Sequence, residues 1–252
     1  MDETGLENNS SSTRFKFLAE LGNTLGYNVN LRNPDNLKSP NGKPIILAAT
    51  HTSDRDMPAI MGALASRMDL RIPYISELVN EEPTATIMKL MGSEHWISLD
   101  YEKTETGEWQ AKKFNPKNFQ PATEALKNGA TVLIAAHDPA YEYILPNHGG
   151  NGAVWLAHEA DAVIIPVAVD THEPDLVGVP KAGRRQSLAT KFRRPTVDVI
   201  IGTPIKLTAL PDGNGKITKD NVRRIHAESD HVMKQLSEML PAAQRGIWAT
   251  KK

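Results

Sequence analysis

A histidine and an acidic residue lie close together in the segment PIILAATHTSDRDMPAIM, residues 44–61. His51 directly follows an apolar run, and four residues separate it from Asp56. The two positions are out of phase on a regular helix, so a tight strand-to-helix turn must bring them together. An aspartate that accepts a hydrogen bond from imidazole fixes the ring tautomer and raises the basicity of the other nitrogen. His51 and Asp56 are therefore candidates for a general base and its partner.

The acidic residues also have a structural interpretation. Asp54 or Asp56 could cap a helix, with Pro58 in its first turn, because the first helical amides need side-chain acceptors and proline has no amide. Capping leaves His51 unexplained, since a polar ring after a buried strand must find a partner or face a cleft. A metal site fits poorly, because Ser53 stands where the pattern H-x-H-x-D-H has its second histidine.

The surrounding elements must position this pair. From Pro44 onward, apolar runs of strand length alternate with segments of helical periodicity. This alternation predicts an α/β fold with a mainly parallel central sheet flanked by helices, whose ligand sites lie outside the carboxyl ends of the strands. His51 and His137 both follow predicted strands at that edge. The predicted strands are 45–50, 71–76, 95–99, 131–136, 162–169 and 196–202, and the predicted helices are 55–67, 80–91, 119–128, 150–160 and 218–240.

A short helical element is expected before the α/β region. Apolar residues at helical spacing over 13–26 predict an amphipathic helix, packed on the main domain or, alternatively, lying on a membrane surface. The polar segment 1–12 is expected to be a disordered tail without the features of a signal peptide, and 13–252 a single domain. The residues at helical spacing are Phe17, Leu18, Leu21 and Leu25.

The composition excludes several function classes. The 252-residue chain has no cysteine, which rules out disulfides, a thiolate nucleophile and cysteine-ligated metal. Its 40% hydrophobic residues and formal net charge of −1 are typical of a globular protein without a global preference for nucleic acid or anionic membrane. No uncharged apolar run approaches the roughly 18 residues that span a bilayer. Any charged partner must therefore bind at a local patch.

Two sequence blocks resemble those of a known enzyme superfamily. The first is the H-x4-D motif of His51 and Asp56 after an apolar strand, and the second is GNGAVWLAHEADAVIIPVAVD, residues 150–170. In order and separation they are similar to the blocks of the 1-acylglycerol-3-phosphate acyltransferase (PlsC-like) superfamily of glycerolipid acyltransferases. The similarity spans residues 45–170. The matching residues of the second block are Gly152, Ala153, Pro166 and Val167.

The resemblance implies a fold, an activity and roles for residues. It implies the glycerol-3-phosphate acyltransferase-like fold, with a helical element before the α/β domain. His51 would deprotonate an acceptor hydroxyl, which attacks the thioester of acyl-CoA or acyl-carrier protein, while Asp56 orients His51. The implied partners are this acyl thioester and a lysophospholipid or related acceptor, with no metal, no bound cofactor and no nucleic acid. The protein is expected in the cytoplasm, free or peripheral on the membrane.

The acceptor-binding motifs depart from the family pattern. The family's strand that ends in Arg ends without one here, in MGSEHWISLDYEK. The family's F-P-E-G-T-R-S loop aligns with AAHDPAYEY, residues 135–143, so that His137 replaces the Glu and Asp138 replaces the Gly. Because those family residues hold the glycerol phosphate, the sequence does not identify the acceptor. We expect His137, Asp138 and, after a loop shift, Glu142 to bind substrate, with a simple Asp-Pro turn as the structural alternative.

A basic run and a helix start complete the predicted substrate site. The run KAGRRQSLATKFRR, residues 181–194, holds six basic residues, including Arg184 and Arg185, and no acidic one. It is expected to be a solvated loop or a site for anionic headgroups or the phosphates of CoA. Its one aromatic residue disfavours base stacking with nucleic acid. Gly152, at the start of the helix in the second block, is expected on the substrate side.

Two other functions remain open on the sequence. A lipid or thioester hydrolase would use His51 and Asp56 to activate water instead of an acceptor hydroxyl. A non-catalytic acyl-lipid-binding homologue would have lost its activity through the altered loop at 135–143. The products formed from a labelled acyl thioester distinguish these functions.

Overall fold

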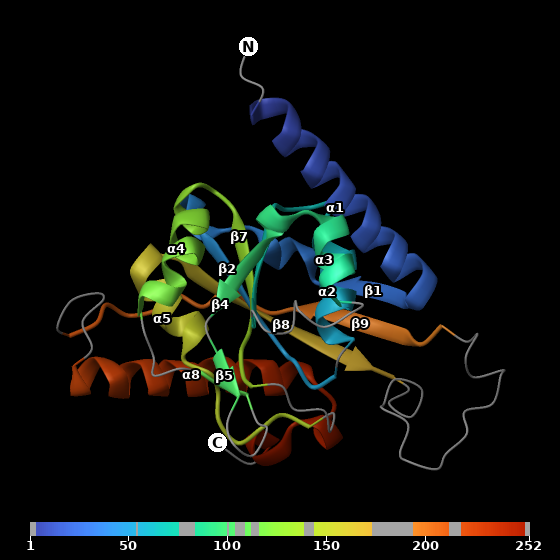
Figure 1. Ribbon diagram of the computed structural model, residues 1–252. Helices are drawn as coiled ribbons and strands as arrows, with labels where there is room; N and C mark the ends of the chain where they lie inside the picture. Colours follow the sequence, from blue (N-terminus) through green and yellow to red (C-terminus); the bar gives the residue numbers. More distant parts are fainter. Residues whose placement is uncertain are drawn as a thin grey trace.

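The computed structural model describes residues 4–53, 55–75, 84–99, 101–103, 109–111, 116–138, 144–172, 194–211 and 218–249. Its central feature is a seven-stranded sheet in the order β1-β9-β8-β2-β7-β3-β4, covered by helices (Figure 1). Neighbouring strands from β8 to β4 are parallel, β9 is antiparallel to β8, and β1 is parallel to β9. The predicted α/β class with a mainly parallel sheet is confirmed.

The strands of the sheet largely coincide with the predicted apolar runs. One edge strand, β1, and a small antiparallel pair, β5 and β6, were not predicted. β1 has the alternating sequence NVNLR, in which alternate side chains are more exposed, as in a half-covered edge strand. The bounds are β1 (Asn28–Arg32), β2 (Ile45–Ala49), β3 (Leu70–Ile75), β4 (Trp96–Leu99), β5 (Tyr101–Lys103), β6 (Trp109–Ala111), β7 (Thr131–Ala135), β8 (Val163–Thr171) and β9 (Thr196–Ile201).

Helices cover both faces of the sheet. One face carries α1, α2 and α3, and the other carries α4, α5 and α8. Short 3₁₀ helices precede β2, β4 and α4 and follow α8. The α-helices are α1 (Thr4–Gly26), α2 (Asp56–Leu64), α3 (Thr84–Met91), α4 (Gln120–Lys127), α5 (Gly152–Ala160) and α8 (Lys219–Met239), and the 3₁₀ helices are η1 (Pro34–Leu37), η2 (Pro40–Gly42), η4 (Ser93–His95), η5 (Pro116–Phe119), η6 (Ala242–Gln244) and η7 (Gly246–Ala249).

The uninterrupted apolar sequence of β2 reflects burial on both faces. Successive side chains of a strand point to opposite faces. Ile46 and Ala48 pack under α4, α5 and α8, whereas Leu47 and Ala49 pack under α1, α2 and α3. All four side chains are 0% exposed. The central strand thus joins the two cores and holds the residues that follow it in a fixed place.

The N-terminal helix is longer than predicted. It begins at Thr4 instead of residue 13, so it includes most of the segment 1–12 that was expected to be a disordered tail. Phe15 and Ala19 bury their side chains in the core under α2. Once packing has formed this part of the helix, adding one more residue to it costs less free energy than nucleating a new helix. Even a polar run can therefore extend the helix. None of the described helices is long and apolar enough to cross a membrane.

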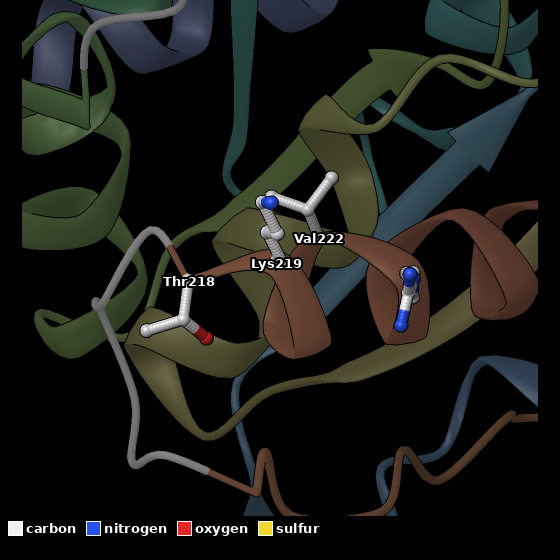
Figure 2. A pocket seen from close by; sticks show the side chains of 4 residues that line it. Thr218, Lys219 and Val222 are labelled. Atoms are coloured by element: carbon white, nitrogen blue, oxygen red, sulfur yellow. The ribbon is translucent and has the colours of Figure 1, made fainter.

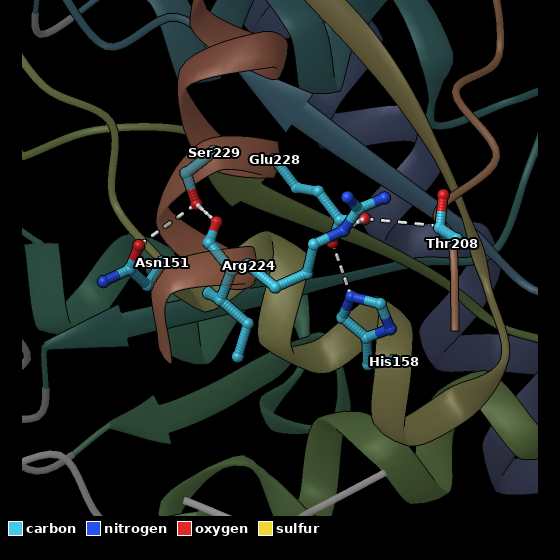
Figure 3. Close-up of polar contacts among 7 residues, drawn as sticks. Asn151, His158, Thr208, Arg224, Glu228 and Ser229 are labelled. Atoms are coloured by element: carbon cyan, nitrogen blue, oxygen red, sulfur yellow. Dashed lines mark hydrogen bonds and ion pairs between the residues drawn. The ribbon is translucent and has the colours of Figure 1, made fainter. Parts of the chain in front are cut away.

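A buried polar network fastens α5 to α8 (Figure 3). Nε2 of His158 on α5 lies 2.6 Å from Oε2 of Glu228 on α8. The other carboxylate oxygen of Glu228 accepts hydrogen bonds from Nε of Arg224 at 3.0 Å and from the backbone amide of Thr208 at 3.3 Å. Both carboxylate oxygens of Glu228 therefore have partners. Its buried charge is not isolated, which would cost much free energy. The network holds α5 against α8.

Candidate active site

The end of β2 is anchored to β8 just before His51. The backbone amide of Thr50 donates to the carbonyl of Val167 at 3.0 Å, and its hydroxyl accepts the amide of Val169 at 3.0 Å. Thr50 is fully buried, and His51 is the first residue after it that is partly exposed. His51 therefore lies at the carboxyl edge of the sheet, the place that the fold favours for a ligand site.

Asp56 organises the turn between His51 and α2. Its Oδ2 accepts the backbone amides of Thr52 at 2.7 Å and of Ser53 at 3.2 Å, and also the Thr52 hydroxyl at 3.2 Å. Its Oδ1 accepts the Ser53 hydroxyl at 2.5 Å. The carboxylate is 1% exposed. The structure therefore brings Asp56 to the same rigid turn as His51, and it shows a structural task for Asp56 beside the predicted catalytic one.

The environment of Asp56 shifts its ionisation. Burial raises the pKa of this carboxyl to about 6 from 3.8, because desolvation outweighs the hydrogen bonds from Ser53 and Thr52, which lower it. Asp56 is mostly ionised at neutral pH and becomes protonated in the mildly acidic range. A negative charge on this turn favours the imidazolium form of a neighbouring histidine.

The capping interpretation is right in part. Pro58 lies in the first turn of α2, as predicted, but the residue at the N-cap position is Arg55, which makes no side-chain cap bond. Asp56 is the first residue of α2 and reaches back to the amide of Ser53, the interaction that an S-x-x-D capping box makes. Asp54, the other predicted cap, lies outside the described residues.

His137 is buried beside His51 and uses both ring nitrogens inside the protein. Its Nε2 accepts the backbone amide of His51 at 3.1 Å, and its Nδ1 lies 2.7 Å from the carbonyl of Asp138. The side chain is 2% exposed, and burial lowers its pKa, against the Asp138 hydrogen bond, which raises it. The structure thus shows a contact of the ring with the backbone of His51, and the contact of His137 with substrate stays a prediction.

The other predicted substrate residues have different surroundings. Asp138 is exposed, directly after His137. Gly152 packs closely, since a Cβ there would approach the side chains of Ile134 and Phe119 at 3.3 Å, and the structure thus gives it a packing role at the start of α5. The remaining predicted residues, Glu142, Arg184 and Arg185, lie outside the described residues.

The carboxyl-terminal segment supports the loop that follows His137. The amide of Leu145 donates to the carbonyl of Gln244 at 2.8 Å, and the indole of Trp248 donates to the carbonyl of Pro146 at 2.7 Å. Gly246 has a φ of +57°, and a Cβ there would come within 2.6 Å of the Leu145 carbonyl. A glycine is thus required where the two segments meet. We call residues 242–249 the carboxyl-terminal brace.

Within the described part of the chain, one group has the spacing of a metal site. Ligand atoms of Asp170, His172 and Asp198 lie within 4.8 Å of one another. Asp198, however, already pairs with Arg32 and with Nε2 of His172 at 3.0 Å, and it accepts a hydrogen bond from Asn30 at 3.0 Å. Burial raises the pKa of Asp198, but these hydrogen bonds together lower it. A guanidinium occupies the place of a cation, so the group acts as an ion-pair network between β1, β9 and β8.

A pocket of about 350 Å³ lies at the beginning of α8 (Figure 2). It is lined by Thr218, Lys219, Val222 and Arg223. Oγ1 of Thr218 accepts the amide of Asn221 at 3.2 Å and so caps the helix. None of the predicted site residues lines this pocket, so it is separate from the turn that holds His51.

A comparison with known structures shows which fold this chain resembles. Neither a family model nor a curated relative matches the chain. Among solved structures, the chain is similar to PlsC, the 1-acyl-sn-glycerophosphate (LPA) acyltransferase from Thermotoga maritima, with a TM-score of 0.56 and 17% identity. The similarity covers 92% of this chain and 82% of that chain. The chain has a PlsC-like fold. This confirms the acyltransferase-like fold implied by the sequence blocks, and it includes a helix before the sheet.

Sequence reasoning missed several residues that build the turn after β2. Thr50, Thr52 and Ser53 hold the turn through hydroxyl and amide hydrogen bonds. The pattern S-x-x-D at Ser53 and Asp56 is the signal that could have revealed the capping interaction. The bond between the His51 amide and the side chain of His137 has no comparable signal, because it joins residues far apart in the sequence.

Proposed function

We propose that the protein is an acyltransferase that moves a fatty acyl group from an acyl thioester to a hydroxyl of a lysophospholipid-like acceptor. The observation that carries the proposal is the placement of His51, partly exposed at the carboxyl edge of the sheet, on a turn fixed by the buried carboxylate of Asp56. The PlsC-like fold supports it, because the fold is shared with an enzyme named as an LPA acyltransferase.

In the proposed reaction, the His51 imidazole takes the proton of the acceptor hydroxyl as the oxygen attacks the thioester carbonyl. The tetrahedral intermediate then collapses, the carbon–sulfur bond breaks, and the imidazolium returns its proton to the leaving thiolate. Asp56 stabilises the imidazolium between the two proton transfers. The base and the activated thioester supply the chemistry, so the proposal invokes no metal and no bound cofactor.

The donor and the acceptor are proposed from chemistry. The donor is an acyl thioester of CoA or of acyl-carrier protein, and the basic run with Arg184 and Arg185 is proposed to bind its phosphates or an anionic headgroup. The acceptor is proposed to differ from a phosphate monoester, because Asp138, an exposed carboxylate, directly follows His137, which stands in the sequence where the family has its phosphate-binding Glu. Glu142 and Gly152 are also proposed as substrate-binding residues.

A peripheral position on the cytoplasmic face of a membrane is proposed from exposed apolar side chains. Phe17 is 61% exposed and Leu21 39% exposed, one turn apart on α1. Leu90 on α3 is 54% exposed, and α1 packs beside α3. Apolar side chains on a helix surface favour binding in the interfacial layer of a bilayer.

The proposal is tested with a labelled acyl-CoA or acyl-carrier protein and a panel of lysophospholipids and monoacylglycerol. The wild-type protein is expected to form acylated lipid, and His51→Ala is expected to lower kcat by at least about 10²-fold. His226→Ala, which removes an exposed histidine on α8, is the matched control and should leave the rate unchanged. Free fatty acid without acylated lipid would establish the hydrolase instead, and undiminished transfer by His51→Ala would contradict the proposal.

A further inference from the structure

We propose that His137 is a positioning residue for His51. Its ring accepts the backbone amide of His51 in place of a carbonyl of the neighbouring strand, and so sets the direction in which the chain that carries the base leaves the sheet. The inference rests on the proposed function for its effect on rate. It assigns His137 a task other than contact with substrate. The argument begins with the hydrogen bonds at the end of the β2 and β7 ladder.

The ladder between β2 and β7 is diverted at His51. The amide of Ala136 donates to the carbonyl of Ala49 at 2.8 Å, which continues the parallel pairing by one step. In a regular parallel ladder, the carbonyl of Ala136 would then accept the amide of His51, two residues after Ala49 on the opposite strand. The carbonyl of Ala136 instead accepts the amide of Gly150 at 2.7 Å. The His51 amide is left to the side chain of His137, at 3.1 Å.

The two bonds of His137 select one tautomer. Because Nε2 accepts a hydrogen bond from an amide, it carries no proton. Nδ1 therefore carries the proton of the neutral ring and donates it to the Asp138 carbonyl at 2.7 Å. Burial favours the neutral ring. By holding the proton on Nδ1, the carbonyl of Asp138 thus keeps Nε2 available as an acceptor for the His51 amide.

Together with Asp56, His137 fixes three successive amides after Thr50. The His51 amide has Nε2 of His137, and the amides of the next two residues, Thr52 and Ser53, have Oδ2 of Asp56. Both acceptors are buried side chains, at 2% and 1% exposure. The backbone that carries the base is thereby held from both sides, by the loop after β7 and by α2. Such fixed positioning matters because small displacements of a reacting group lower rates steeply.

Substitutions of His137 separate the acceptor from the rest of the ring. His137→Gln keeps an acceptor, because its Oε1 can take the place of Nε2, and His137→Leu fills a similar volume without one. We expect His137→Leu to lower kcat about 10- to 100-fold with little change in KM, and His137→Gln to recover most of kcat. Equal kcat in wild type and His137→Leu, or equal loss in Leu and Gln variants that are both folded, would overturn the inference.

His95 provides the matched control. It is also 2% exposed, and its Nδ1 lies 2.9 Å from the carbonyl of Leu70. It precedes β4, at the sheet edge opposite His51, because the two strands run in the same direction. His95→Leu should lower stability by an amount similar to His137→Leu while leaving kcat unchanged. If His95→Leu lowers kcat as much as His137→Leu, the loss reflects stability, and the positioning role is refuted.

A second measurement does not depend on activity or on variants that fold. In wild-type protein labelled with ¹⁵N, the bond predicts scalar coupling between the His51 amide nitrogen and Nε2 of His137, and a proton on Nδ1. Detection of both supports the inference even if no acyl transfer is found, which would refute the proposed function alone. A proton on Nε2 of His137 would overturn the inference whatever the activity.

Discussion

Oδ2 of Asp56 accepts the backbone amide of Thr52 at 2.7 Å, one residue beyond the proposed base. The carboxylate therefore has two tasks that substitution can separate. One is to supply oxygen acceptors to the turn, which a neutral amide side chain can also do. The other, which we propose, is to supply a negative charge to the imidazolium of His51, which only an ionised side chain can do.

Asp56→Asn and Asp56→Ala should therefore differ in stability more than in activity. Asp56→Ala leaves two buried amides without an acceptor and is expected to lower the free energy of unfolding by about 2–4 kcal/mol. Asp56→Asn keeps an oxygen for those amides and should be more stable than the Ala variant. Both should lower kcat strongly, because neither carries the charge. Urea unfolding and acyl-transfer rates measure the two effects, and an Asn variant with full kcat would contradict the catalytic role.

The raised pKa of Asp56 predicts a pH dependence of stability. The folded protein holds this proton up to about pH 6, whereas the unfolded chain releases it near 3.8. In this window the folded state binds more protons, so the contribution of Asp56 to the free energy of unfolding is present below the window and lost as pH rises through it. Relative to Asp56→Asn, the wild type should lose about 3 kcal/mol between these limits. Unfolding by urea at several pH values measures this, and parallel pH profiles of the two proteins would contradict it.

Asp138 should disfavour acceptors with a phosphate near it. We expect Asp138→Asn to raise the rate with lysophosphatidic acid, relative to monoacylglycerol, by about 3- to 10-fold, because it removes a repulsive charge at the surface. Asp230→Asn, which removes an exposed carboxylate on α8, is the control. The ratio of the two kcat/KM values is the measurement. An unchanged ratio would show that the acceptor headgroup does not approach this loop.

The exposed apolar side chains of α1 should bind lipid surfaces. Phe17→Ser together with Leu21→Ser is expected to lower binding to phosphatidylglycerol vesicles by about tenfold or more, because apolar area no longer leaves water. Val222→Ser is the control, since Val222 is 37% exposed on α8. Co-sedimentation with vesicles measures the bound fraction. Equal loss of binding in the control and the double variant would argue against a specific role of α1.

Local sequence predicted the parts of the fold that repeat a simple pattern. The strand β2 is apolar at every position, and β7 and β8 are mostly apolar, because both faces of these strands are buried, and this pattern placed His51 at the carboxyl edge of the sheet. The H-x4-D motif then identified the turn that Asp56 organises. These features depend on residues that are neighbours in the chain, so their signal is present in a short stretch of sequence.

The remaining features depend on contacts between distant segments. The direction of β9 is set by pairing with β8, and β1 pairs with β9 through Asn30 and Arg32, which bond to Asp198. The contact of His137 with the His51 amide likewise arises because two parallel strands end side by side. No periodicity within either segment encodes such a partner, so the sequence did not predict this contact.

The carboxyl-terminal brace has a consequence for the order in which the site is completed during synthesis. The turn of His51 and the loop of His137 are translated before Gln244 and Trp248, which support that loop through Leu145 and Pro146. A nascent chain that has not yet released these residues from the ribosome therefore lacks the contacts that support this loop. The candidate site should therefore reach its full structure only once residue 248 is free to fold back.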